Sequence, residues 1–385
     1  MNENDKDPQD FNILEEKSNY FFQVDFLKAL MILLVIIDHS LAYSATPGLG
    51  LQLWERIAIP IFLIIMGFNM GKSFVKEGEK SLKELYSWNY FKKKFWRYVY
   101  PYIVLYFVGI IFGFILYGTT FPDTFKENWF LEYIVFQKSL LEGPGNWFIP
   151  IVFQSIFLMP LLYKAFTKWP KLSLISCFII EFFMHLIVFF VIGEVNSIND
   201  FLREVYFRYI ILLYISALGM GIWFSQDHNL FSKRNLFIWI LFPFSTIYMI
   251  AWDFYGFRLA IDGANIIRGD YNYITFIYSA FIFLIAMKYI PQNSKTKIAK
   301  IFSAIGKATF HIYLTQDIYF IISYIIHTQG SADLPTIANI FGIVSTEFLV
   351  NILLIILNWI ICIPCGVIWW YVDNKIRKLR LDKRV

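Results

Sequence analysis

The chain has 385 residues, of which 58% are hydrophobic and only 16% are charged. A soluble domain of this size has too little interior to bury so much apolar surface, because its exterior must carry polar side chains. The composition therefore excludes a soluble globular enzyme, a disordered chain and a secreted disulfide scaffold, and it predicts a polytopic membrane protein. The formal net charge of +5 is less informative than the positions of the charges.

The two ends of the chain differ in charge. Residues 1–20 are polar and rich in Asp and Glu, which excludes a secretory signal peptide, so we expect the first apolar run to remain as a membrane span. Residues 375–385 are basic, and we expect them to rest on anionic lipid head groups. The predicted organisation is a cytoplasmic polar tail over 1–20, a single transmembrane domain over 21–374 and a basic cytoplasmic tail over 375–385.

The apolar runs between the two tails predict an all-α fold of about ten transmembrane helices, because a spanning helix needs about 20 mostly apolar residues. The aromatic segment 125–142 is interrupted by charged residues, and we expect an interfacial or partly re-entrant helix there. The predicted spans are 22–44, 53–74, 98–119, 146–166, 172–193, 205–225, 236–252, 273–291, 307–327 and 343–372.

The distribution of positive charge predicts the orientation, because Lys and Arg are enriched on the cytoplasmic side of a membrane protein. Most of the 34 Lys and Arg residues lie in segments that would share a side with the N-terminus, including eight in the segment 72–97. We therefore expect both termini in the cytoplasm and an even number of spans. We find no internal repeat of the kind that marks many transporters.

The first predicted span carries four ionisable residues, Asp25, Lys28, Asp38 and His39. Such groups are costly in a bilayer and are candidates for function. Lys28 and His39 share one helix face roughly 16 Å apart along the axis, and Asp25 is placed to form an ion pair with Lys28. His39 suits either a general base for a hydroxyl nucleophile or a hydrogen-bonded residue that only holds helices together. Asp38 points about 100° away from His39 around the helix.

The pattern Asp25-Phe-Leu-Lys28, ten residues and then His39 resembles the first span of the acyltransferase-3 family of integral membrane O-acyltransferases. Further motifs similar to those of the family follow in the same order along the chain. They are Phe62-Leu-Ile-Ile-Met66-Gly67-Phe68, Phe91-Lys92-Lys93-Lys94-Phe95-Trp96-Arg97 with Pro101, Asn146-Trp147-Phe148 with Pro160-Leu161-Leu162, and Ile305-Gly306 with Ile312-Tyr313-Leu314.

Three positions depart from the family pattern. Lys28 stands where Arg is usual, which keeps the charge but loses bidentate recognition. Met66 replaces a usual Ser, and Gln316 replaces a common His. These departures indicate a divergent branch and bear on the substrate more than on the fold.

The resemblance implies transfer of an acyl group, most often acetyl, from acyl-CoA to a hydroxyl of a glycan or another small acceptor. His39 would be the general base, with Asp38 beside it, and Asp25 and Lys28 would line the donor channel. The basic residues Lys92, Lys93, Lys94 and Arg97 would bind the phosphates of CoA, although positive-inside anchoring also explains a basic loop. Direct transfer and an acyl-enzyme relay both stay open, and no metal is expected.

Four residues near the outer side are candidates for contacting the acceptor or a developing oxyanion: Trp147, Arg208, Glu55 and Arg258. The charged and aromatic loop of Arg258 also suits an ordinary interface belt, and Arg208 suits a snorkelling anchor equally well. The expected partners are the lipid bilayer, acyl-CoA, a glycan acceptor and polysaccharide-synthesis machinery, with no nucleic acid. The richness in Ile, Phe, Lys and Asn indicates a prokaryotic plasma membrane.

Two alternatives to acyl transfer remain. One is a non-enzymatic polysaccharide exporter, because some members of the family belong to polymer-synthesis systems. The other is a proton-coupled carrier that uses Asp38 and His39 as a relay. The missing repeat and the ordered motifs favour the acyltransferase over the carrier.

Overall fold

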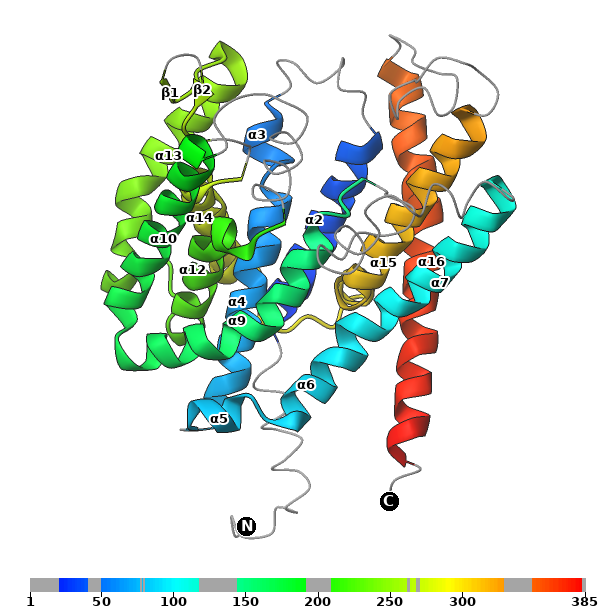
Figure 1. Cartoon of the computed structure of the whole chain (residues 1–385), viewed down its shortest axis with the longest axis horizontal. Coiled ribbons are helices and arrows are strands. Elements are labelled where there is room, and N and C mark those ends of the chain that lie inside the picture. Colours follow the sequence, from blue (N-terminus) through cyan, green and yellow to red (C-terminus); the bar gives the residue numbers. More distant parts are fainter. Residues whose placement is uncertain are drawn as a thin grey trace.

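The structure is a computed structural model that describes residues 21–40, 50–76, 78, 80–117, 144–191, 209–261, 264–267, 271–328 and 348–382. Helices make up nearly all of these residues (Figure 1), so the prediction of an all-α protein is confirmed. The long helices are α2 (Phe22–Ser40), α4 (Ala58–Lys76), α7 (Tyr100–Tyr117), α9 (Phe148–Lys168), α10 (Pro170–Val191), α12 (Ile215–Gln226), α13 (Leu236–Tyr255), α14 (Tyr273–Tyr289), α15 (Lys297–Thr328) and α16 (Phe348–Asp382).

Shorter elements connect these helices. Strands β1 and β2 pair antiparallel in a small hairpin, with Ala260 opposite Asn265 and Ile261 opposite Ala264. The remaining elements are α3 (Leu51–Trp54), α5 (Leu82–Leu85), α6 (Trp88–Lys94), the π-helix η2 (Phe95–Val99), the 3-10 helices η5 (Ile211–Tyr214) and η6 (Lys233–Asn235), β1 (Ala260–Ile261) and β2 (Ala264–Asn265).

Six helical stretches of the described residues are long and apolar enough to cross a membrane. Each of the ten predicted ranges overlaps a described helix, but α2, α12, α14 and α15 lie outside this set of six. Helices α12 and α14 are short, and α2 and α15 carry polar or charged side chains that lower their apolar content. Crossing of the membrane by these four helices, and the orientation of the termini, stay predictions.

Three other predictions concern the segment 125–142 and the two tails of the chain. The segment 125–142 and the tail 1–20 lie outside the described residues. At the other end, α16 runs without a break to Asp382, so residues 375–382 of the basic tail continue this helix.

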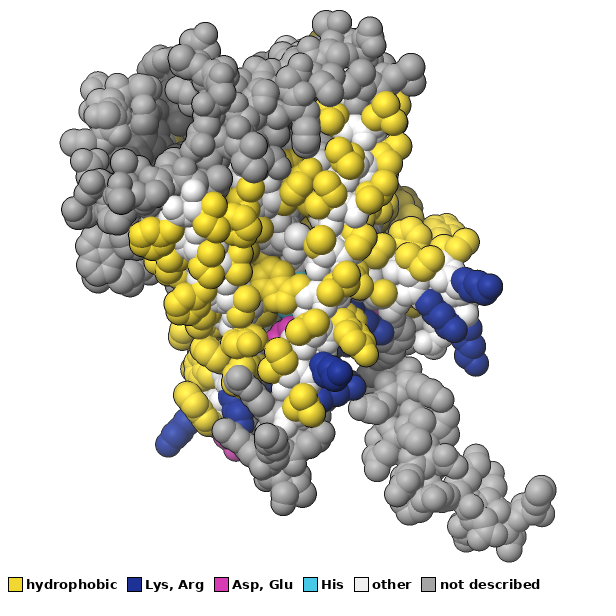
Figure 2. Space-filling view, turned by 90° about the vertical axis from the view of Figure 1, so that its right-hand side faces the viewer, with side chains coloured by type: hydrophobic (Ala, Val, Ile, Leu, Met, Phe, Trp, Pro, Cys, Tyr) yellow, Lys and Arg dark blue, Asp and Glu magenta, His cyan; other side chains and the backbone are white. Residues whose placement is uncertain are grey.

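Many large hydrophobic side chains lie on the outside of the molecule, as expected for a surface in contact with lipid. Figure 2 shows hydrophobic side chains over the middle of one face and Lys and Arg side chains towards its lower part. On helices α7 and α16, which lie on the right in Figure 1, Phe107, Ile115 and Ile360 are more than half exposed. An exterior of this kind explains why 58% hydrophobic residues do not need a larger core.

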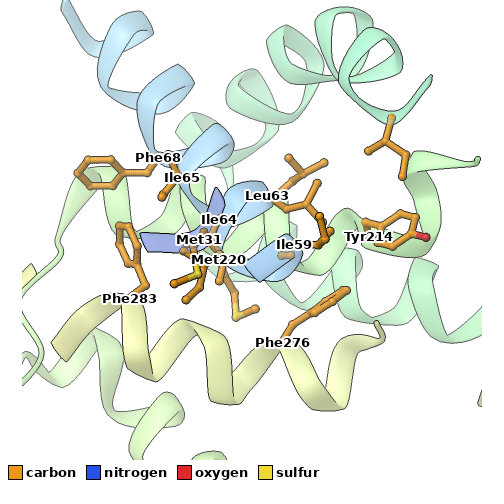
Figure 3. Close-up of a cluster of buried hydrophobic side chains, with 14 of the residues drawn as sticks. Met31, Ile59, Leu63, Ile64, Ile65, Phe68, Tyr214, Met220, Phe276 and Phe283 are labelled. Carbon is orange, nitrogen blue, oxygen red and sulfur yellow. The ribbon is translucent and has the colours of Figure 1, made fainter. Parts of the chain in front are cut away.

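Helices α4 and α12 cross in very close contact at two glycines. A Cβ atom added to Gly221 would overlap the carbonyl oxygen of Ile64, and one added to Gly67 would overlap the carbonyl oxygen of Leu218. Small residues of this kind let two backbones approach in a membrane protein, where packing replaces the hydrophobic effect as the driving force. Met31, Leu63, Ile64 and Met220 form part of the buried apolar cluster around this contact (Figure 3).

A buried carboxylate joins three helices on the other side of α12. Glu181 of α10 is fully buried and accepts hydrogen bonds from the backbone N–H and the hydroxyl of Ser216, at 3.0 and 2.6 Å. It also accepts one from the backbone of Tyr273. Ser216 and Tyr273 lie in the first turns of α12 and α14, where backbone N–H groups have no partner within the helix. The carboxylate therefore accepts hydrogen bonds from the first turns of two helices at once.

Candidate active site

A cavity of about 600 Å³ opens among α2, α4, α9, α15, α16 and the η2 turn. Phe62, Phe148 and Val152 form part of an apolar wall, and six basic side chains also line the cavity. Its cationic side chains come from five different elements and face only one acidic group, Asp25, among the described residues that line the cavity. These cations are Lys28, Lys72, Lys76, Arg97, Lys307 and Arg377. The surplus of positive charge suits an anionic occupant.

The cavity extends from the last turns of α4 to the first residue of α9. Lys72 and Lys76 lie at the end of α4, and Phe148 opens α9. His228 packs against Phe68 near the basic end, with ring centroids 5.8 Å apart. Burial, assisted by the neighbouring Lys72 ammonium, lowers the pKa of His228 below its ordinary value. His228 is therefore uncharged at neutral pH and adds nothing to the positive field of the lysines.

Arg97 reaches the cavity from a π-helical turn. The span that begins with α6 changes to the π-helix η2 at Phe95–Val99 before it continues as α7. Such turns are rare and occur often at functional sites, because the inserted residue changes the face to which side chains point. Among the four basic residues predicted for phosphate binding, Arg97 alone lines the cavity.

The other three basic residues of that motif, Lys92, Lys93 and Lys94, close α6 and do not line the cavity. Lys93 is exposed, and Lys94 directs its ammonium towards Sδ of Met70 and the ring of Tyr90. Four cations take their place in the cavity wall: Lys72, Lys76, Lys307 and Arg377. These four lie at span ends or in segments where positive-inside charge alone explains them, so the sequence did not indicate them as site residues.

Asp25 and Lys28 form the ion pair that the spacing predicted. Oδ1 of Asp25 lies 2.6 Å from Nζ of Lys28, and the hydroxyl of Ser303 donates to Oδ2 of the same carboxylate at 3.3 Å. Both residues line the cavity. Helix α15 passes so close to this point that a Cβ atom added to Gly306 would overlap the backbone of Asp25. The pair is therefore held in a fixed position between α2 and α15.

His39 lies at the far end of α2, next to the loop that precedes α9. Its Nδ1 atom is 3.1 Å from Oε1 of Gln316 on α15. A Cβ atom added to Gly145 would lie 3.1 Å from Cε1 of His39 and 3.0 Å from the hydroxyl oxygen of Tyr313. His39 does not line the cavity, but Tyr313 does.

Tyr313 links the cavity to the surroundings of His39. Its hydroxyl donates a hydrogen bond to the carbonyl oxygen of Gly145, and its ring contacts that of Phe148 edge to face at 5.7 Å. Tyr313 therefore touches the cavity on one side and the backbone beside His39 on the other. We refer to Tyr313 and Gly145 together as the Tyr313–Gly145 layer. The sequence motif Ile312-Tyr313-Leu314 contains this tyrosine, but only the fold reveals its position.

Asp38 pairs with an arginine instead of with His39. Its two carboxylate oxygens lie 3.1 and 3.4 Å from the two terminal nitrogens of Arg56. Nε of Arg56 in turn lies 3.2 Å from Oε2 of Glu55, which is almost fully buried. Oδ2 of Asp38 is 3.8 Å from Nε2 of His39. Asp38, Arg56 and Glu55 therefore form a charged chain beside the imidazole.

Two of the remaining predicted residues, Trp147 and Arg258, do not line the cavity. Trp147 precedes α9 and stacks on Tyr214, with centroids 5.6 Å apart. Arg258 lies over the ring of Trp252 at 3.5 Å and donates to the carbonyl oxygens of Trp252 and Phe257, so its guanidinium is engaged within its own loop. Arg208 lies outside the described residues.

A second imidazole lies on the cavity wall. Nε2 of His311 is 3.2 Å from Oδ2 of Asp373, which also lies 3.4 Å from Nε of Arg377. His311 belongs to α15, and the other two residues belong to α16. The chain of contacts binds α16 to α15 and places the Arg377 cation at the cavity.

Comparison with protein families adds an independent observation to this geometry. A family model described as an acyltransferase domain, that of the acyltransferase-3 family, matches residues 21–371. The chain belongs to the acyltransferase-3 family. No curated protein and no solved structure matches it. Family membership and the apolar helices together support a multi-pass membrane acyltransferase. The matched range includes His39, Arg97 and Gln316, so the candidate site lies within the family domain.

Proposed function

We propose that the chain is a membrane O-acyltransferase that moves an acyl group from cytoplasmic acyl-CoA to a hydroxyl of a cell-surface glycan or its lipid-linked precursor. The observation that carries the proposal is the basic cavity, which ends at the Tyr313–Gly145 layer in contact with His39. A phosphate-bearing donor fits its basic end, and a neutral acyl arm fits its apolar wall. The proposed acyl group is acetyl, as in most of the family.

Electrostatics favours CoA as the occupant of the cavity. The phosphates of CoA would meet Lys72, Lys76 and Arg97, which lie on two separate elements, whereas Arg377 already pairs with Asp373. Ammonium and guanidinium groups are good phosphate ligands, and the low dielectric of a membrane protein strengthens the attraction. Lys28 is partly neutralised by Asp25, so it suits the wall of the channel better than direct phosphate binding.

The chemistry needs one proton acceptor. His39 would take the proton of the acceptor hydroxyl while the hydroxyl oxygen attacks the thioester carbonyl. A new C–O bond forms, the C–S bond breaks, and the thiolate of CoA leaves and recovers the proton from His39. The products are an O-acyl ester and CoA with a free thiol. Asp38, already held by Arg56, would contribute a nearby negative charge to stabilise the transient imidazolium.

A cytoplasmic location of both termini would suit this direction of transfer. With both termini in the cytoplasm, the ends of α4 and α16 that line the basic part of the cavity face the cytoplasmic pool of CoA. His39, the Trp147 loop and the β1–β2 hairpin then lie towards the outer side, where a glycan acceptor is found. A prokaryotic plasma membrane with polysaccharide-synthesis enzymes as neighbours is the setting that suits such an acceptor.

The test is acetyl transfer by the purified chain in lipid nanodiscs, with radiolabelled acetyl-CoA and a panel of membrane glycans from the source cells. We expect labelled ester in the wild type and a loss of about 10²- to 10⁴-fold in His39→Ala, the range that a general base contributes. His228→Ala is the matched control, because His228 packs near the basic end of the cavity and away from the proposed chemistry.

Two results would contradict the proposal. Transfer by His39→Ala at the wild-type rate would exclude His39 as the base. Export of polysaccharide by the wild type in the absence of acyl-CoA, with no labelled ester formed, would favour the exporter instead.

A further inference from the structure

His39 faces a different polar group at each of its ring nitrogens. Nδ1 lies 3.1 Å from the amide oxygen of Gln316, which is hydrogen-bond distance. Nε2 lies 3.8 Å from Oδ2 of Asp38, which is too long for a hydrogen bond. Gln316 is therefore the polar group that orients the imidazole ring.

Asp38 is engaged by Arg56, which contacts both of its carboxylate oxygens, and it lies beyond hydrogen-bond distance of His39. The guanidinium fork holds the carboxylate in a geometry that suits a carboxylate–arginine pair. The charge of Asp38 still acts on the imidazole across 3.8 Å, but its direct hydrogen bonds go to Arg56. Orientation and charge near His39 thus come from two separate residues.

The chemistry of an amide oxygen decides the tautomer. This oxygen only accepts hydrogen bonds, so with the amide oxygen facing the ring, Nδ1 of a neutral His39 carries the proton and the lone pair is left on Nε2. Gln316 is fully buried, and its contact with His39 joins α15 to α2. A buried polar side chain in a close-packed helix contact has little freedom to turn away.

We propose that Gln316 is a positioning residue that holds His39 in the tautomer protonated at Nδ1, so that Nε2 is the atom that removes the acceptor proton. The inference rests on the proposed function and adds the identity of the reacting nitrogen and of the residue that selects it. An amide achieves this without placing a further negative charge beside Asp38 and Glu55. In the sequence, Gln316 stands out only as a departure from the family pattern.

The first experiment needs no substrate. The chain is labelled with ¹⁵N-histidine, placed in nanodiscs and examined by solid-state NMR, with the His39 signals assigned by their loss in His39→Gln. We expect His39 of the wild type to show the Nδ1–H tautomer. Gln316→Leu, which removes the acceptor, is expected to give a mixture of tautomers or the Nε2–H form. Gln316→Glu, which keeps an oxygen acceptor, is expected to restore the Nδ1–H form.

The second experiment is kinetic and uses the same proteins. We expect Gln316→Leu to lower kcat by about 10- to 100-fold, part of the full contribution of a general base. The KM for acetyl-CoA is expected to stay within about twofold, because Gln316 does not line the donor cavity. Gln316→Glu is expected to recover most of kcat. Thr315→Val is the matched control, because the Thr315 hydroxyl donates only to the backbone of its own helix, at His311.

The outcomes separate this inference from the proposed function. An active wild type with His39 in the Nε2–H form overturns the inference alone. The same holds if Gln316→Leu matches the wild type in both kcat and spectrum while its melting temperature shows that it is folded. A wild type that transfers no acetyl group overturns the proposed function, and the base role of Nε2 with it. A kcat loss in Gln316→Leu that Thr315→Val reproduces would indicate a packing effect and would overturn the inference as well.

Discussion

The ionic groups of α2 are neutralised in two different ways. Asp25 pairs with Lys28 on the same helix, at 2.6 Å, as the spacing of three residues predicted. Asp38 pairs with Arg56, which comes from the segment between α3 and α4. The first pair depends on local sequence, and the second depends on tertiary structure. Each reduces the cost of burying charge in a protein surrounded by lipid.

The basic wall of the cavity leads to a prediction about donor affinity. We expect Arg97→Ala and Lys72→Ala each to raise the KM for acetyl-CoA about tenfold or more, because each removes a cation that can bond to phosphate. The rate at saturating donor is expected to change little, since neither residue touches the reacting atoms. Steady-state kinetics in nanodiscs over a range of acetyl-CoA concentrations measures both quantities.

Lys93→Ala is the control for this comparison. Lys93 belongs to the same basic motif as Arg97, but it is exposed and does not line the cavity. We expect the KM of Lys93→Ala for acetyl-CoA to equal that of the wild type. If Lys93→Ala raises the KM for acetyl-CoA as much as Arg97→Ala does, the phosphates bind at the surface loop and not in the cavity.

The candidate site was predicted from sequence where its residues are neighbours in the chain. Asp25, Lys28, Asp38 and His39 lie on one helix, and the family motifs marked Arg97 and Tyr313. The cations Lys72, Lys307 and Arg377 come from three helices, and no local pattern indicates that they face one cavity. For the same reason, the sequence did not indicate that Arg56 contacts Asp38 or that Gln316 contacts His39. A contact between distant segments of the chain leaves no periodic signal in either segment.

The helices were predicted well because an apolar run is a local property. All ten predicted ranges overlap described helices, since about 20 apolar residues favour a helix in lipid whatever their neighbours are. Their detailed geometry was not predicted. The π-helical turn at Phe95–Val99 and the continuation of α16 to Asp382 depend on packing and on the absence of a strong stop signal.

The crossing of α4 and α12 supports a prediction about stability. Gly221→Ala is expected to destabilise the protein by at least about 1–3 kcal/mol, because the added methyl group overlaps the carbonyl oxygen of Ile64, a backbone atom that cannot rotate away. Thermal unfolding in detergent, followed by the loss of monodisperse protein, should show a lower melting temperature.

Gly109→Ala on α7 is the matched control. A Cβ atom at Gly109 meets nothing within 4 Å, and Ala favours a helix over Gly by about 1 kcal/mol. We expect its melting temperature to equal or exceed that of the wild type. Equal melting temperatures of Gly221→Ala and Gly109→Ala would mean that α4 and α12 do not pack through Gly221.

The orientation of the protein in the membrane can be tested directly. Tyr255 at the end of α13 is 81% exposed, and Lys93 at the end of α6 is exposed as well; Figure 1 places the two helix ends at opposite ends of the molecule. We expect a cysteine at Tyr255 to react with a membrane-impermeant maleimide on intact cells. A cysteine at Lys93 should react only after the membrane is opened.

The background for this experiment is Cys365→Ser, because Cys365 is exposed whereas Cys177 and Cys362 are buried. Labelling of the Lys93→Cys protein on intact cells would show that the protein has the opposite orientation in the membrane. The basic cavity would then open away from the cytoplasmic pool of CoA, and the donor would have to be a different phosphate-bearing molecule.

The Tyr313–Gly145 layer also bears on the permeability of the membrane. An enzyme that takes its donor from one side of a bilayer and its acceptor from the other needs a path for an acyl group, yet a continuous water-filled path would let protons and ions leak down their gradients. The tyrosine hydroxyl, bonded to the backbone beside His39, stands between the basic cavity and His39 and would close such a path at this depth. A bound donor would itself fill the space below, so the cell could run the reaction without dissipating its membrane potential.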